Sequence, residues 1–216
     1  MSCRTVLLVE PNYKNKYPPM GLMKLATYYR CRGDSVRFFK GDLKFFSAQP
    51  LLEEYMESID KEESLVGNIV KNFIMKRGSL KILEYIRTGK HAPLEMISDF
   101  SRSSSDMEKC SVNNLLEALA NYRNRYKNED YPKFDRVAVT TLFTFYWKET
   151  IDTILFAKKL CKHIKDVHVG GITASLVPDY IQKETGIRHY VGLLSEPSVY
   201  DKDDKGAVVI DELPLD

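Results

Sequence analysis

Short apolar runs alternate with helical patterns at both ends of this chain. Apolar runs of roughly four to eight residues bounded by turn residues predict buried strands. Such runs occupy residues 4–9, 35–39, 136–141, 166–169 and 188–191, and residues 207–210 form either a sixth strand or part of the exit. Helical spacing covers residues 20–32, 148–165 and 175–185, and Gly33 is expected to cap the first helix. This rhythm predicts an α/β fold with a doubly wound, mostly parallel sheet of the flavodoxin-like (Rossmann-like) kind.

The middle of the chain loses this rhythm and shows helical spacing alone. Helices are predicted at residues 51–59, 65–75, 80–86 and 112–126, with breaks at Gly78-Ser79 and at residues 89–93 and a loop at residues 101–106. A regular α/β fold has a single crossover helix here. We therefore expect a large helical insertion between strands two and three, covering residues 44–131, within an α/β domain made of residues 1–43 and 132–200. Residues 201–216, which end in IDELPLD, are expected to be a linker toward a further C-terminal domain.

Composition narrows the class of protein. The chain has 216 residues, of which 44% are hydrophobic, and a formal net charge of +2. It has neither an apolar run of about 18 residues nor a signal-peptide pattern, so we expect a cytoplasmic protein without a membrane partner. The near-neutral charge argues against bulk recognition of nucleic acid. Four dispersed cysteines without a CxxC pair argue against a zinc or iron–sulfur site held by this chain alone.

Three loops are candidates for a binding site. In the strand order 2-1-3-4-5, ligands bind beyond the carboxyl ends of the strands, where residues 10–21, 142–147 and 170–174 would lie. Gly170-Gly171 either lets the backbone approach a bulky or phosphorylated ligand, aided by Thr173, or serves a turn that needs positive φ. The threonines and aromatic residues of the second loop suit a flat ring that also needs hydrogen bonds, although about half of the aromatic residues are expected to belong to the core.

Four segments together resemble a known family. They are VLLVEPN, YPPMGLMKLATYYRCRGDSV, VTTLFTFYWKETI and VHVGGITASLVPDY, and the motif positions are Pro18, Pro19, Gly21, Leu22, Arg30, Gly33, Asp34, Val36, Thr140, Thr141, Thr144, Gly170, Gly171 and Pro178. The match covers about residues 4–42 and 134–194. It is similar to the N-terminal cobalamin (B12)-binding-like domain of B12-dependent-type radical SAM proteins.

The resemblance implies a cofactor and a partner. Cobalamin would lie against the three loops, with these binding residues: Pro11, Asn12, Tyr17, Pro18, Pro19, Gly21, Leu22, Thr140, Thr141, Thr144, Gly170, Gly171 and Thr173. The DxHxxG motif that gives cobalt a histidine in mutase-type relatives is absent. S-adenosylmethionine and a [4Fe–4S] cluster would belong to a C-terminal radical SAM domain or partner chain, where a CxxxCxxC triplet would hold the cluster. This chain lacks the triplet.

Three functions are therefore compared. The leading hypothesis is an accessory domain without catalytic activity of its own, because the chain has no GxSxG, HExxH, P-loop or GxGxxG motif. It binds a corrinoid or serves as a degenerate structural or substrate-positioning module. The first alternative is a protein-interaction scaffold that works through the helical insertion. The second is a tRNA- or nucleic-acid-binding module using residues 70–90, where six Lys or Arg accompany one acid, although a solvated helix face explains this charge run as well.

Overall fold

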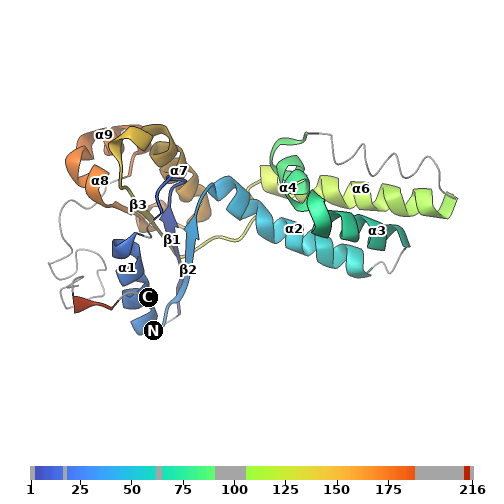
Figure 1. The fold of residues 1–216 in the computed structure, drawn as a ribbon, viewed down its shortest axis with the longest axis horizontal. Coiled ribbons are helices and arrows are strands. Elements are labelled where there is room, and N and C mark those ends of the chain that lie inside the picture. The colour runs from blue at the N-terminus through green and yellow to red at the C-terminus, as the bar shows by residue number, and fades with distance from the viewer. Residues whose placement is uncertain (1–2, 17–18, 62–64, 91–105, 188–211, 215–216) are drawn as a thin grey trace. The chain divides into compact units, whose positions relative to one another are not determined.

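The computed structural model describes residues 3–16, 19–61, 65–90, 106–187 and 212–214 (Figure 1). The chain divides into two compact units. One unit, here called the α/β unit, consists of Met1–Leu43 and Lys133–Asp216, and the other, the helical unit, consists of Lys44–Pro132. No helix in the described ranges combines the length and the apolar character that a membrane span requires.

The α/β unit is built on a four-stranded parallel sheet. Its strands are β1 (Thr5–Glu10), β2 (Ser35–Lys40), β3 (Arg136–Thr140) and β4 (Val167–Gly170), in the order β2-β1-β3-β4. The α/β class and the first four positions of the 2-1-3-4-5 order are thus confirmed. The strands predicted at residues 188–191 and 207–210 fall outside the described residues.

Helices cover both faces of this sheet. They are α1 (Met20–Cys31), α7 (Trp147–Leu160), α8 (Ile172–Leu176) and α9 (Pro178–Thr185), with 3-10 turns at Thr144–Tyr146 and Ile164–Asp166. Because β2 and β3 flank β1 on opposite sides, right-handed crossovers place α1 and α7 on opposite faces. The α1 face buries Val6, Leu8 and Ala138 of the sheet against the helix. Gly33 follows α1 with φ +83°, which confirms its capping role.

Two helix boundaries of the α/β unit differ from the prediction, and in the rest of the chain the helices predicted over residues 51–59 and 112–126 extend to Leu43–Lys61 and Asp106–Lys127. The helix predicted over residues 148–165 ends at Leu160, because Cys161 turns extended and forms a parallel bridge with Phe134. The helix predicted over residues 175–185 is two helices, α8 and α9, which are separated before Pro178. Proline cannot donate the hydrogen bond that a continuous helix needs at that position.

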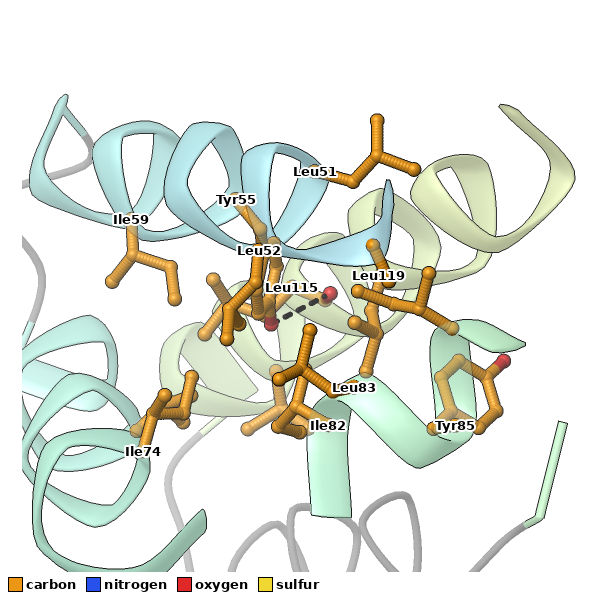
Figure 2. Close-up of a cluster of buried hydrophobic side chains, with 14 residues drawn as sticks. Leu51, Leu52, Tyr55, Ile59, Ile74, Ile82, Leu83, Tyr85, Leu115 and Leu119 are labelled. Carbon is orange, nitrogen blue, oxygen red and sulfur yellow. Dashed lines mark hydrogen bonds between the residues drawn. The ribbon is translucent and has the colours of Figure 1, made fainter. Parts of the chain in front are cut away.

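The helical unit consists of α2 (Leu43–Lys61), α3 (Leu65–Phe73), α4 (Ser79–Thr88) and α6 (Asp106–Lys127), with α2 beginning at the last residue of the α/β unit. The break predicted at Gly78-Ser79 is instead a π-helical turn, Ile74–Gly78, that joins α3 to α4. Leucine and isoleucine side chains from these helices form one buried cluster, in which the Tyr55 hydroxyl donates to the Leu115 carbonyl at 3.2 Å (Figure 2). Gly89 ends α4 with φ +76°, as the predicted break requires.

Candidate functional site

Tyr13 ties the first loop to the loop after β3. Its buried ring stacks on Tyr146 with centroids 5.4 Å apart and meets the edge of Phe143 at 5.6 Å. Thr150 donates its hydroxyl to the Tyr146 carbonyl, so the Tyr13 hydroxyl donates to Thr150 Oγ1 across 2.7 Å. Burial raises the pKa of Tyr13, because the effect of removing the hydroxyl from solvent is larger than the opposite effect of its hydrogen bond to Thr150. The loops of residues 10–21 and 142–147 therefore meet at the carboxyl edge, as the strand order predicted.

A row of four residues ends the strands on the face covered by α1. Lys40 pairs with Glu10 across β2 and β1, and Thr140 pairs with Gly170 across β3 and β4. Since Val9 pairs with Val139, Glu10 and Thr140 are the next neighbours in that register. Side chains alternate along a strand, so this row lies one step beyond Leu8 and Ala138 on the same face. Neighbouring positions at this edge thus carry an ammonium group, a carboxylate, a hydroxyl group and a glycine without a side chain, in the order Lys40, Glu10, Thr140, Gly170.

Glu10 is the most buried charged residue of this row. Its side chain is 0% exposed, and Oε1 accepts a hydrogen bond from Asn15 Nδ2 at 2.8 Å and lies 3.3 Å from Lys40 Nζ. Lys40 in turn donates to the backbone and side-chain oxygens of Asn15. The other carboxylate oxygen, Oε2, is buried and has no hydrogen-bond partner within the described part of the chain. Buried carboxylate oxygens rarely stay unpaired, so this atom marks a place where a partner is missing.

The glycine doublet divides into two different roles. Gly171 has φ +103°, and a Cβ there would meet Thr141 O at 2.5 Å and Thr141 N at 2.9 Å. Thr141 is buried and fully engaged, because its Oγ1 donates to the Gly170 carbonyl and accepts from the Ala174 amide, both at 2.9 Å. Gly171 is therefore a glycine for close packing within the chain. Gly170 has nothing within 4 Å of its would-be Cβ, so space remains open there.

The other predicted site residues lie in varied surroundings. Leu22 belongs to the buried cluster under α1 and does not face a ligand, and Pro11 and Pro19 are also buried. Asn12, Gly21 and Thr144 are exposed, while Tyr17 and Pro18 lie outside the described residues. Thr173 is fully buried, and its Oγ1 has no hydrogen-bond partner in the described ranges. Thr140 and Gly170 are the predicted residues that stand in the row beside Glu10.

Exposed apolar side chains surround the same edge. Met20 begins α1, Phe145 lies in the turn after β3, Ile172 and Leu176 lie on α8, and Tyr180 lies in the first turn of α9, all between 46% and 73% exposed. Tyr180 packs on Trp147, the first residue of α7, at 4.3 Å between ring centroids. These five side chains, here called the apolar rim, follow the carboxyl ends of β1, β3 and β4. Exposed apolar side chains near strand ends are candidates for contact with a ligand or a partner.

The described parts also include candidate metal ligands and the basic stretch of the helical unit. No group of three or more His, Cys, Asp or Glu that could hold a metal is found there. His163 precedes β4 and His168 lies inside it, so neither follows a carboxyl end. In the basic stretch of residues 70–90, Lys71 pairs with Asp60, Lys90 pairs with Glu84 at 2.6 Å, and the Arg87 guanidinium lies 3.8 Å from the Phe45 ring centroid. Three of the six cations of this stretch therefore have a partner within the helical unit.

The comparisons with known proteins return no match: no family model, no curated protein and no solved structure resembles this chain. The residues named above therefore rest on geometry alone.

Sequence reasoning placed Glu10, Tyr13 and Asn15 in a candidate loop without naming them as site residues, and it missed Lys40. Several of the contacts that single them out join distant parts of the sequence, such as the contact between Tyr13 and Thr150. One signal was available, because Glu10 is a charged residue that directly follows the apolar run Val6–Val9. A carboxylate at the last position of such a strand points to the functional edge of a parallel sheet.

Proposed function

We propose that the α/β unit is an accessory domain that binds a corrinoid at the carboxyl edge of its sheet and has no catalytic activity of its own. The observation that carries this proposal is the apolar rim beside the row of polar residues. A flat macrocycle with polar groups on its periphery requires both kinds of surface, and hydrophobic sites with a few placed polar groups are the usual form of ligand sites.

Cobalamin fits some of the residues and not others. Thr140 and Gly170 offer a hydroxyl and open backbone in the row, and Phe145 and Ile172 offer exposed apolar surface. Thr141 and Gly171 are used by the fold itself, so we no longer assign them to the ligand. The described carboxyl edge contains no histidine, so these residues would not supply an imidazole to a bound cobalamin. When bound, this cofactor supplies an alkyl-carrying, redox-active cobalt.

The remainder of the proposal concerns what lies around this domain. The helices between β2 and β3 would be an insertion into a flavodoxin-like fold and would recognise the substrate. A radical SAM domain, following in the same chain or on a partner, would supply S-adenosylmethionine, a [4Fe–4S] cluster and the reaction. The apolar rim supports such a partner too, because a second domain could cover it together with the ligand. We place the assembly in the cytoplasm.

Binding of hydroxocobalamin tests the proposal. The purified chain is incubated with the cofactor, desalted and examined by visible absorption, and we expect a retained chromophore. Phe145→Ala in the rim should release it, whereas Ile164→Ala, a change at another exposed apolar residue before β4, should not. No retained chromophore with the wild-type chain would refute corrinoid binding. Equal retention by both variants would refute the rim as its site.

A second candidate function is a protein-interaction scaffold. Met75 in the π-helical turn and Leu80 in α4 are each 69% exposed, so the helical unit also presents apolar side chains to solvent. A Met75→Lys, Leu80→Lys double variant should lose a partner captured by the wild-type chain if this surface works. Capture that survives the double change would count against it.

A further inference from the structure

The unpaired oxygen of Glu10 carries an inference about what the site recognises. Glu10 is the last residue of β1, and its carboxylate stands in the row between Lys40 and Thr140. Within the described residues, Oε1 has two partners, Asn15 and Lys40, and Oε2 has none. An ionised carboxylate can only accept hydrogen bonds. The missing partner is therefore a donor.

The charge of that donor follows from Lys40. The ammonium group lies 3.3 Å from Oε1 and already balances the carboxylate. A second cation at Oε2 would leave a net positive charge in a place where Glu10 is fully buried, and burying unbalanced charge is costly. A neutral N–H or O–H group completes the hydrogen bonding without adding charge. Asn15 does this on the other side, because its neutral carboxamide donates to Oε1 at 2.8 Å.

We propose that Glu10 is a recognition residue for a neutral carboxamide group of the ligand, with Lys40 fixing the charge of the site. The carboxamide N–H donates to Oε2, and the neighbouring Thr140 hydroxyl can donate to the carboxamide oxygen. This deepens the proposed function, on which it rests, since a corrin ring carries carboxamide side chains around its periphery. Because the Glu10 side chain is 0% exposed, a ligand reaches Oε2 only after surrounding side chains move.

The test uses two small probes of similar size, propionamide and n-propylammonium, with the whole chain carrying ¹³C-labelled glutamate. The Glu10 carboxyl ¹³C resonance reports directly on the group in question. We expect propionamide to shift it saturably and to bind at least tenfold more tightly than n-propylammonium. Loss of a hydrogen bond to a charged acceptor corresponds to roughly ten- to hundredfold in affinity, so Glu10→Gln should weaken propionamide binding by that factor. For this variant, binding is followed by the Gly41 and Gly170 amide resonances.

Two further variants make the outcome decisive. Lys40→Met leaves the carboxylate unbalanced and should reverse the preference toward n-propylammonium. Glu184→Gln, an exposed change on α9, should alter neither probe. The proposal is overturned if propionamide leaves the Glu10 resonance unmoved, because no carboxamide then reaches Oε2. It is also overturned if the wild-type chain prefers n-propylammonium, or if Lys40→Met leaves the preference unchanged. None of these results depends on hydroxocobalamin, so corrinoid binding stands or fails separately.

Discussion

Replacing Gly171 by alanine separates a structural glycine from a ligand-facing one. Gly171 connects β4 to α8 with φ +103° and ψ −175°, a region that side chains other than hydrogen rarely occupy. The new Cβ would lie 2.5 Å from Thr141 O and 2.9 Å from Thr141 N. Both neighbours are backbone atoms at the end of β3, so they cannot rotate away as a flexible side chain could.

The expected cost combines strain and lost hydrogen bonds. Holding alanine in this backbone region costs about 1–3 kcal/mol. To relieve the contact, Thr141 must move away from the turn, which weakens its bonds to the Ala174 amide and the Gly170 carbonyl, each contributing about 1 kcal/mol. We expect Gly171→Ala to lower the free energy of unfolding of the α/β unit by about 3–5 kcal/mol. This is a large part of the stability of a typical domain.

Urea unfolding followed by tryptophan fluorescence measures this loss. Trp147 is the single tryptophan and packs on Tyr180 at 4.3 Å, so its emission reports on the α/β unit. Gly170→Ala is the matched control, because its Cβ meets nothing within 4 Å and should change stability by less than about 1 kcal/mol. Equal unfolding midpoints for the two variants would refute the close-packing role of Gly171. If Gly170→Ala alone lost binding of hydroxocobalamin, the ligand would be assigned to Gly170.

Three further variants test other parts of the structure. Tyr13→Phe removes the bond to Thr150 and should cost about 1 kcal/mol in urea unfolding near neutral pH. Burial raises the pKa of Tyr13 above its ordinary value of 10.0, so the wild-type chain loses stability as pH rises past 10.0. Above this pH, the difference in free energy of unfolding between the wild-type chain and Tyr13→Phe should therefore become smaller. Hydrogen bonds lower the pKa of Asp135 from 3.8 to about 2. The stability that Asp135 contributes above pH 3.8 is therefore lost as the pH falls toward 2. In Asp135→Asn, the urea midpoint of unfolding should depend less on pH in this range. Leu119→Ala in the helical core should cost about 2–5 kcal/mol by far-UV circular dichroism, whereas exposed Leu80→Ala should stay within about 0.5 kcal/mol.

Local patterns predicted the fold wherever local forces decide it. Short apolar runs identified all four described strands, and Gly33 and Gly89 ended helices where they were expected to. The prediction failed where a distant segment decides the conformation. Leu160 and Ile164 continue the helical spacing of α7, yet the chain leaves the helix at Cys161 because Phe134 pairs with it. No property of residues 148–165 alone reveals that pairing.

The site was predictable as a place and not as a set of contacts. Strand order alone brings the loops after β1 and β3 together, and Tyr13 confirms that they meet. The role of Gly171 depends on how closely Thr141 approaches it, which the sequence cannot express. Likewise, Lys40 is unremarkable as the last residue of a strand until the register places it opposite Glu10. Parallel pairing brings the ends of separate strands together at one edge, so the side chains that become neighbours there are known only once the register of the strands is known.

The two halves of the edge constrain any ligand, whether or not it is a corrinoid. The polar half is built by β1 and β2 through Glu10 and Lys40, and most of the apolar rim follows β3 and β4 through residues such as Phe145 and Ile172. A small carboxamide would engage the first half alone, while a macrocycle with amide groups would engage both. Propionamide binding without hydroxocobalamin binding would therefore leave the rim without a ligand, and its apolar side chains would then be assigned to a partner protein. Tight hydroxocobalamin binding that is lost in both Phe145→Ala and Glu10→Gln would join the halves into one site.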